Sequence, residues 1–257
     1  MPSNGRQGRD ALGLPPGIQA CLFDVDGVLT ETARLHTEAW QRVFDDLLRA
    51  RADRTGDRFV PFDPAADMDA YVDGKPREDG VRSFLASRGI DLPEGRDDDP
   101  ASAWTVSAIA RRKDEIVLAL FHERGVRAFP GSRRYLEAVH RAGLSTAAVS
   151  SSRNCAEVLE AAGLSAGLDA RVDGVIAAEE RLAGKPAPDV YLAAARAVGV
   201  PPARAAVFED AEAGVEAGRA GDFAFVVGVD RRGRPERLRA AGAHLVVADL
   251  AELLGDP

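Results

Sequence analysis

Hydrophobic positions change their spacing along the chain. From Ile18 to Val25 the apolar residues are nearly continuous, which is typical of a short buried strand. Beyond that strand they recur every three or four positions, as on the buried face of a helix. The residues that show this spacing best are Leu35, Ala39, Trp40, Val43, Phe44, Leu47 and Leu48. The pattern therefore predicts a strand followed by a long helix.

The rest of the chain falls into a helical part and an alternating part. Helical patterns continue at 77–88 and 103–122, and the polar stretch 51–69 is interrupted by prolines. After Pro130 short apolar strands alternate with helices, and the predicted strands lie at 146–149, 175–176, 205–208, 223–227 and 245–247. Such alternation indicates a parallel sheet with helices on both faces.

These patterns predict an α/β fold whose core is a doubly wound parallel sheet of the Rossmann-like type. We expect residues 17–32 and 129–257 to form this core, and residues 33–128 to form an inserted, all-helical cap. Residues 1–16 are polar and rich in Gly, Pro and Arg, and are expected to form a flexible tail.

Composition narrows the classes of function. The net charge of -8 argues against a nucleic-acid partner, and no apolar run is long enough for a membrane-spanning helix or a secretory signal. The cysteines, Cys21 and Cys155, both fall in predicted core elements, which indicates a reducing compartment rather than a disulfide framework. We therefore expect a cytoplasmic protein, with nothing in the sequence that demands more than a monomer.

Polar side chains follow the predicted strands where each strand ends. Asp24, Ser150 and the pair Glu209–Asp210 come directly after strands, and Lys185 lies in a loop after another. In a doubly wound sheet, ligands bind beyond the carboxyl ends of the strands. We therefore expect these side chains to converge at one edge of the sheet.

The converging groups suit phosphoryl transfer. A carboxylate such as Asp24 can attack phosphorus and form an acyl-phosphate, and Asp26 lies close enough to move the proton of the leaving or attacking oxygen. Lys185 would offset negative charge, and the Ser150 hydroxyl would donate to a phosphate oxygen. Clustered Asp and Glu oxygens are hard ligands that suit one Mg2+ ion.

Each of these features also has a simpler interpretation. An Asp-x-Asp-Gly segment is usually a turn, and Glu209–Asp210 could cap the helix that follows. The residues 150–154 could form only a loop, and a lysine before a proline is more often solvated. The order of all four features after successive strands favours a common site.

The motifs resemble those of a known superfamily. The segments DVDGVLTET (24–32), VSSSRN (149–154), GKPAPDVY (184–191) and VFEDAEAGVEAG (207–218) resemble the four motifs of the haloacid dehalogenase superfamily, in the same order. Within it, the opening segment 24–40, VDGKPRED (72–79) and ARRKDE (110–115) resemble the β-phosphoglucomutase family. This resemblance implies interconversion of β-D-glucose 1-phosphate and D-glucose 6-phosphate through a glucose 1,6-bisphosphate intermediate.

The resemblance also assigns roles to residues. Asp24 corresponds to the phosphorylated nucleophile and Asp26 to the general acid/base. The implied Mg2+ ligands are Asp24, the backbone carbonyl of Asp26, Glu209 and Asp210. Ser150 and Lys185 correspond to ligands of the transferring phosphoryl group. The implied substrate-binding residues are Thr32, His36, Gly74, Lys75, Arg77, Lys113, Ser152, Arg153 and Asn154.

The chain also departs from the family pattern. Asp73 and Arg153 each stand where the family has a lysine, and the polar stretch 51–69 makes the cap longer. Two alternatives to a sugar-phosphate mutase remain open at this point. One is a Mg2+-dependent sugar-phosphate phosphatase, in which water accepts the phosphoryl group, and the other is a non-catalytic module that only binds sugar phosphates.

Overall fold

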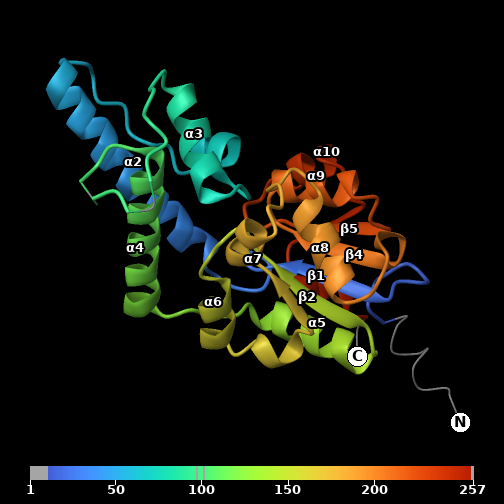
Figure 1. The fold of residues 1–257 in the computed structure, drawn as a ribbon. Helices are drawn as coiled ribbons and strands as arrows, with labels where there is room; N and C mark the ends of the chain where they lie inside the picture. Colours follow the sequence, from blue (N-terminus) through green and yellow to red (C-terminus); the bar gives the residue numbers. More distant parts are fainter. Residues whose placement is uncertain (1–10, 97, 101, 256–257) are drawn as a thin grey trace, which may run out of the picture. The chain divides into compact units, whose positions relative to one another are not determined.

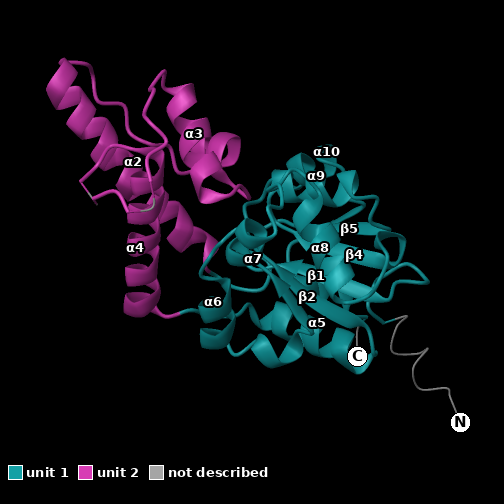
Figure 2. Cartoon of the chain, viewed as in Figure 1, with its two compact units in different colours: residues 1–31, 126–257 teal, residues 32–125 magenta. Residues whose placement is uncertain are grey.

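The structure, a computed structural model, describes residues 11–96, 98–100 and 102–255. The chain divides into two compact units (Figure 2). The core unit comprises the described residues up to Glu31 and from Val126 onward, and the cap unit runs from Thr32 to Gly125. Each unit has a hydrophobic core of its own.

A parallel sheet forms the centre of the core unit (Figure 1). Its strands are β1 (Ala20–Asp24), β2 (Ser145–Val149), β3 (Ala170–Val172), β4 (Ala205–Glu209), β5 (Phe225–Val229) and β6 (Leu245–Val247). They lie in the order β3-β2-β1-β4-β5-β6, and every neighbouring pair is parallel. This order is that of a doubly wound sheet and confirms the predicted fold class.

Helices cover the sheet on both faces. The helices of the core unit are α5 (Pro130–Arg141), α6 (Cys155–Ala161), α7 (Gly174–Glu179), α8 (Asp189–Ala197), α9 (Glu212–Ala220) and α10 (Pro235–Ala240). The 3₁₀ turns are Ser165–Gly167, Pro202–Arg204 and Leu250–Leu253. Alternate residues of the strands, such as Leu22 and Val207, pack with α8, α9 and α10 in one hydrophobic cluster. On the other face, Phe23 and Phe208 pack against Tyr135 of α5. Strand β1 is therefore buried throughout, as its continuous apolar run predicted.

Two sequence expectations differ from the structure. The apolar pair Val175–Ile176, predicted as a strand, begins helix α7, because the Asp173 side chain accepts hydrogen bonds from both of their backbone N–H groups. The strand of this region is β3, just before it. In the expected tail, Leu12 is buried, and its carbonyl accepts a hydrogen bond from the Tyr135 hydroxyl. The rest of that tail, residues 1–10, lies outside the described residues.

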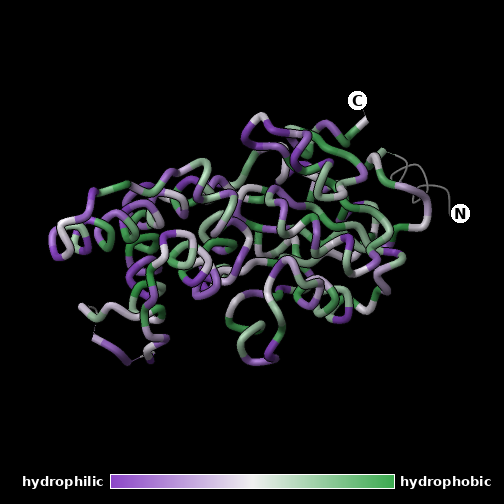
Figure 3. The backbone as a smooth tube through the Cα atoms, turned by 90° about the horizontal axis from the view of Figure 1, so that it is seen from above, coloured by the Kyte–Doolittle hydropathy of each residue, from purple (hydrophilic) through white to green (hydrophobic). Residues whose placement is uncertain are grey.

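The cap unit is built from helices. They are α2 (Ala33–Thr55), a π-helical turn (Met68–Val72), α3 (Arg77–Ser87) and α4 (Val106–Arg124). Hydrophilic and hydrophobic segments alternate along them, as expected for helices with one buried face (Figure 3). Phe44, Phe62 and Phe84 form an aromatic cluster with Trp40 at its edge. Phe62 comes from the polar stretch 51–69, which therefore contributes to this core.

Two smaller findings complete the fold. Cys21 and Cys155 are both buried free thiols, in strand β1 and at the start of α6. Along the described part of the chain, no helix has both the length and the hydrophobicity that crossing a membrane requires.

Candidate active site

Three neighbouring strands end in polar residues at the same edge of the sheet. Asp24 is the last residue of β1 and Glu209 the last of β4, while Ser150 follows β2 directly. Asp24 is in register with Val149, so the ends of β1 and β2 lie side by side. The strand order reverses between β1 and β4, which is the place where doubly wound sheets bind ligands.

Lys185 lies between the carboxylates of Asp24 and Glu209. Its Nζ is 2.6 Å from Asp24 Oδ1 and also donates to Glu209 Oε1. The Lys185 side chain is only 1% exposed, which contradicts the simpler interpretation of a solvated surface lysine. Burial alone would lower the Lys185 pKa, but the charges of Asp24 and Glu209 raise it well above its usual value, so the ammonium stays protonated.

The surroundings of Asp24 oppose its ionisation. Burial raises the pKa of the Asp24 carboxyl well above its usual value, and the nearby charges of Glu209 and Asp26 raise it further. Lys185 acts in the opposite direction without cancelling these effects. A nucleophilic carboxylate must be ionised, so the site needs more positive charge than Lys185 supplies.

The donor set of the site fits a divalent cation. Asp24, Glu209 and Asp210 each offer a carboxylate oxygen, and these oxygens lie within 4.8 Å of one another. Hard oxygen donors with excess negative charge are what Mg2+ prefers. Gly27 is needed beside them, because its φ is +105° and a Cβ there would lie 2.0 Å from Asp210 Oδ2. The role of the Asp26 carbonyl as a metal ligand stays a prediction.

Glu209 is held by three hydrogen bonds. Its Oε1 accepts from Lys185 and from the Tyr191 hydroxyl at 2.9 Å, and its Oε2 accepts from the Ala211 backbone N–H at 2.9 Å. The sequence analysis gave Tyr191 no role, although the residue ends the quoted segment GKPAPDVY. The sequence signal for Tyr191 was its place at the end of this segment, as the third residue of helix α8.

Ser150 links the loop after β2 to Asp26. Its Oγ donates to Asp26 Oδ2 at 3.1 Å and accepts from the Ser152 backbone N–H at 3.0 Å. Ser152 Oγ in turn accepts from the Asn154 N–H, and Arg153 is exposed. Among the described residues, the buried Nδ2 of Asn154 has no hydrogen-bond partner, so this predicted phosphate ligand offers a free donor.

Three of the predicted ligands in the cap unit are connected by polar and charged contacts between its helices. Lys113 Nζ is 2.9 Å from His36 Nδ1 and 3.5 Å from Asp114 Oδ1, and lies over the Trp40 ring. Asp114 also accepts from Arg77, which pairs with Glu78 at 2.8 Å. His36, Lys113 and Arg77 thus come together within the cap unit. Asp114, the carboxylate that joins them, was not singled out from the sequence.

The other predicted cap residues have different surroundings. Thr32 is buried, and its carbonyl accepts hydrogen bonds from Leu35 and His36 at the start of α2. Gly74 has a φ of +73°, and Lys75 Nζ donates to Ser83 Oγ at 3.1 Å. Thr32 thus lies at the start of α2, and Gly74 and Lys75 lie in the turn before α3.

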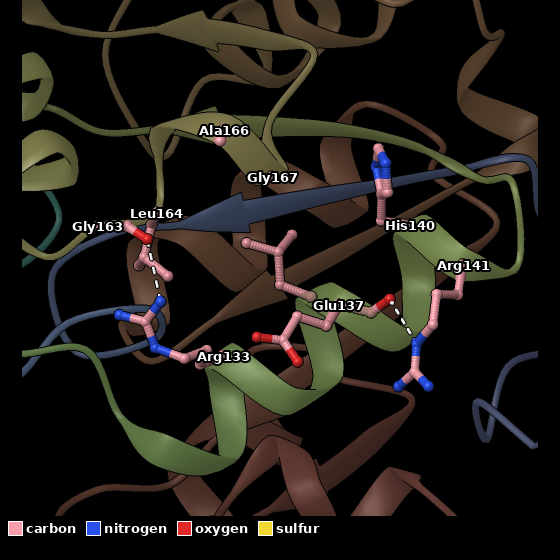
Figure 4. A pocket seen from close by; sticks show the side chains of 9 residues that line it. Arg133, Glu137, His140, Arg141, Gly163, Leu164, Ala166 and Gly167 are labelled. Atoms are coloured by element: carbon pink, nitrogen blue, oxygen red, sulfur yellow. Dashed lines mark hydrogen bonds between the residues drawn. The ribbon is translucent and has the colours of Figure 1, made fainter.

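A further hollow of about 560 Å3 lies in the core unit, between α5 and residues 163–167 (Figure 4). Arg133 crosses it and donates to the carbonyl of Gly163, while Leu136 and Leu164 supply apolar surface. Its lining includes no residue predicted to act in the site. The hollow is therefore separate from the cluster around Asp24.

Comparison with known proteins places these motifs in a family. A family model for haloacid dehalogenase-like hydrolases matches residues 18–222. A Mycobacterium tuberculosis protein named β-phosphoglucomutase is 58% identical over 246 residues, which cover 95% of this chain and 94% of the relative. A Bacillus subtilis protein of the same name is 30% identical, and the match covers 92% of each chain.

Solved structures agree with these relatives. The β-phosphoglucomutase of Clostridium difficile is 26% identical with a TM-score of 0.72, over 92% of this chain and 93% of that one. CbbY from Rhodobacter sphaeroides, solved in complex with phosphate, is 27% identical with a TM-score of 0.68, over 92% and 96%.

Proposed function

This chain belongs to the β-phosphoglucomutase family of the haloacid dehalogenase-like hydrolases, and from that premise we propose that it is a magnesium-dependent phosphomutase. It interconverts β-D-glucose 1-phosphate and D-glucose 6-phosphate through glucose 1,6-bisphosphate. The main structural support for phosphoryl transfer is the buried Lys185 ammonium, which lies between Asp24 and Glu209. The choice of sugar rests on the 58% identity to a relative named β-phosphoglucomutase.

Asp24 carries the phosphoryl group between two sugar hydroxyls. In the first transfer, the phosphoryl group passes from Asp24 to the 6-hydroxyl of glucose 1-phosphate, and Asp26 accepts the proton of that hydroxyl. In the second, Asp24 attacks the phosphorus at C1, the bond to the C1 oxygen breaks, and Asp26 returns the proton to that oxygen. Proton and phosphoryl group therefore balance over one cycle.

The other residues of the core unit stabilise charge. Lys185 neutralises part of the negative charge on Asp24 and on the phosphoryl oxygens, and Ser150 donates to one of those oxygens. Asp24, the Asp26 carbonyl, Glu209 and Asp210 would hold Mg2+, which when bound would supply positive charge beyond that of Lys185. With no phosphoryl group bound, the Ser150 hydroxyl, which has a single proton to donate, donates to Asp26 Oδ2 at 3.1 Å.

We propose further substrate ligands in each unit, residues 152–154 in the core unit and a separate set in the cap, for which the sequence predicted residues 33–128. We assign the distal phosphate to Arg77, Ser152 and Asn154 and the sugar to Gly74 and Lys75, with Thr32 and Arg153 as further substrate-binding residues. His36 and Lys113 support acid/base positioning and cap closure respectively. Water must be excluded during transfer, since it would otherwise hydrolyse the aspartyl-phosphate. We further propose that the enzyme works in the cytoplasm as a monomer on small sugar phosphates.

A coupled assay tests this function. The enzyme is mixed with Mg2+, a trace of glucose 1,6-bisphosphate and either anomer of glucose 1-phosphate, and glucose 6-phosphate is detected with its dehydrogenase. We expect turnover of the β anomer with far slower turnover of the α anomer. Glucose 6-phosphate formation from neither anomer, with orthophosphate released instead, would favour the phosphatase alternative.

A further inference from the structure

Arg231 contacts the catalytic loop from a distant part of the chain. It lies just after β5, its side chain is 16% exposed, and its Nε donates to the Gly27 carbonyl at 3.0 Å. Gly27 directly follows Asp26 and lies against Asp210. The Arg231 guanidinium therefore acts on the Gly27–Val28 peptide group, one peptide group beyond the proposed acid/base.

The same guanidinium joins two other segments of the core unit. Its Nη1 donates to the Ala248 carbonyl at 2.7 Å and to Asp249 Oδ2 at 3.0 Å. Its Cζ lies 3.7 Å from the centre of the Phe129 ring, just before α5. Lysine at this position could keep a single hydrogen bond but not the planar, multidentate contact that stacks on the ring. Residues 248–249 and the Phe129 ring thus hold the Arg231 guanidinium in the position from which it donates to Gly27.

The backbone of Gly27, in the loop that Arg231 contacts, is conformationally flexible unless other groups restrain it. Gly27 has a φ of +105°. Because glycine has no side chain, its backbone could also adopt other φ values at little cost. Its N–H donates to the Thr30 carbonyl at 2.9 Å, which restrains one side of the residue. The Arg231 contact restrains the carbonyl side, so both peptide groups of Gly27 are fixed.

A second contact restrains the following residue. Ser132 Oγ donates to the Val28 carbonyl at 2.6 Å, and Arg231 Nη2 lies 3.4 Å from that hydroxyl and 3.5 Å from Val28 O. Phe129 N–H also donates to the Leu29 carbonyl at 3.0 Å. The loop 27–29 is therefore pinned to the start of α5, with Arg231 at the junction.

We propose that Arg231 is a positioning residue that keeps the Asp26 carboxyl group in place by fixing the Gly27 peptide. This proposal rests on the acid/base role given to Asp26 in the proposed function. A misplaced general acid slows only those transfers in which the leaving oxygen needs a proton. Loss of Arg231 should therefore penalise poor leaving groups more than good ones.

The experiment compares two aryl phosphates. Phenyl phosphate has a basic leaving group that needs protonation, whereas 4-nitrophenyl phosphate has an activated one that does not. The phenol released in the first turnover is measured for wild type, Arg231→Gln, Arg231→Lys and a matched control, Arg239→Gln. Arg239 is an exposed arginine paired with Glu236 in the same unit. Thermal unfolding of each variant is followed in parallel.

For Arg231→Gln we expect a loss of about tenfold with phenyl phosphate and less than about twofold with 4-nitrophenyl phosphate. Arg231→Lys should show a smaller loss with the same selectivity, and it decides the question if the glutamine variant does not fold. Arg239→Gln should match wild type with both compounds. Equal losses on the two compounds, or no loss, would overturn the proposal. The assay uses no glucose phosphate, so it tests the role of Arg231 independently of the sugar. The coupled assay described above shows separately whether the wild-type enzyme is a mutase.

Discussion

At the scale of single residues, Glu209 shows how a buried carboxylate is prepared for a metal. It is fully buried, and burial of a carboxylate is costly unless its oxygens are paired. Lys185 and Tyr191 occupy Oε1, and the Ala211 N–H occupies one acceptor position of Oε2. Since a carboxylate oxygen has two lone pairs, Oε2 keeps one acceptor position for a cation.

Tyr191 should therefore tune the affinity for Mg2+. Tyr191→Phe removes only the hydroxyl that donates to Glu209 and leaves the ring in its packing with Phe223. We expect Mg2+ binding to weaken by roughly tenfold, because outer hydrogen bonds orient metal ligands. Titration calorimetry of the metal-free protein with Mg2+ measures this directly.

Tyr135 provides the matched control. Its hydroxyl is also buried, but it donates to the Leu12 carbonyl and not to a proposed metal ligand. Tyr135→Phe should lower the unfolding temperature and leave Mg2+ affinity unchanged. Equal Mg2+ affinities of Tyr191→Phe and wild type would show that the hydroxyl does not orient Glu209.

The sequence predicts a site residue when that residue follows a strand. Asp24, Ser150 and Glu209 were predicted because the ends of parallel strands share an edge, and in the structure Lys185 contacts both Asp24 and Glu209. Tyr191 and Arg231 were not found, because each acts through a contact between segments distant in the sequence. Such contacts depend on tertiary packing, and neither residue lies in a pattern that local spacing distinguishes.

At the scale of elements, parallel alignment brings like charges to one edge of the sheet. Asp24 at the end of β1 lies close to Glu209 at the end of β4, and Asp26 follows within the next loop. Burial, Glu209 and Asp26 together raise the pKa of the Asp24 carboxyl well above its usual value. The fold thus opposes ionisation of this carboxyl when no metal is present.

Stabilisation by Mg2+ should therefore grow with pH. Because the Asp24 pKa is higher in the folded than in the unfolded protein, this carboxyl stabilises the fold fully at a pH below its usual pKa of about 4. That contribution to the free energy of unfolding is lost as the pH rises through the folded-state pKa. Mg2+ binds the ionised form and relieves this loss, so metal binding competes with protons. We expect the Mg2+-induced rise in unfolding temperature to increase from about pH 5 to about pH 8. A rise that is constant, or larger at low pH, would contradict this charge assignment.

Elements also show where local patterns mislead. Val175 and Ile176 are β-branched and apolar, which favours a strand, yet the Asp173 cap begins a helix there. The neighbouring strand β3 contains only three residues and includes Arg171, so its apolar pattern is weak. By contrast, β1 carries a continuous apolar run and α2 a long regular pattern, and the sequence predicted both elements.

At the scale of the whole molecule, the chain holds two separate hydrophobic cores. The cap core centres on Phe44, Phe62 and Phe84, whereas the core unit packs strands against helices. Phe84→Ala should cost about 3 to 5 kcal/mol within the cap, because it leaves a cavity among close-packed rings. Hydrogen exchange should then lose protection in the helices of residues 32–125 and keep it in β1 and β4.

Phe208→Ala is the reciprocal test. Phe208 packs against Phe23 and Tyr135 in the core unit, so its loss should reduce protection of the strands and leave α2 and α4 protected. Both variants are followed by hydrogen exchange with mass spectrometry. If either substitution lowered protection uniformly in both units, the two cores would behave as one cooperative structure.

The central claim is that Asp24 transfers a phosphoryl group between two hydroxyls of one sugar without losing it to water. A 31P NMR time course with Mg2+, β-glucose 1-phosphate and a trace of glucose 1,6-bisphosphate tests it most directly, with Asp24→Asn as the matched variant. We expect the glucose 6-phosphate signal to grow without orthophosphate, and Asp24→Asn to show no conversion. Orthophosphate as the main product, or conversion by Asp24→Asn, would contradict it.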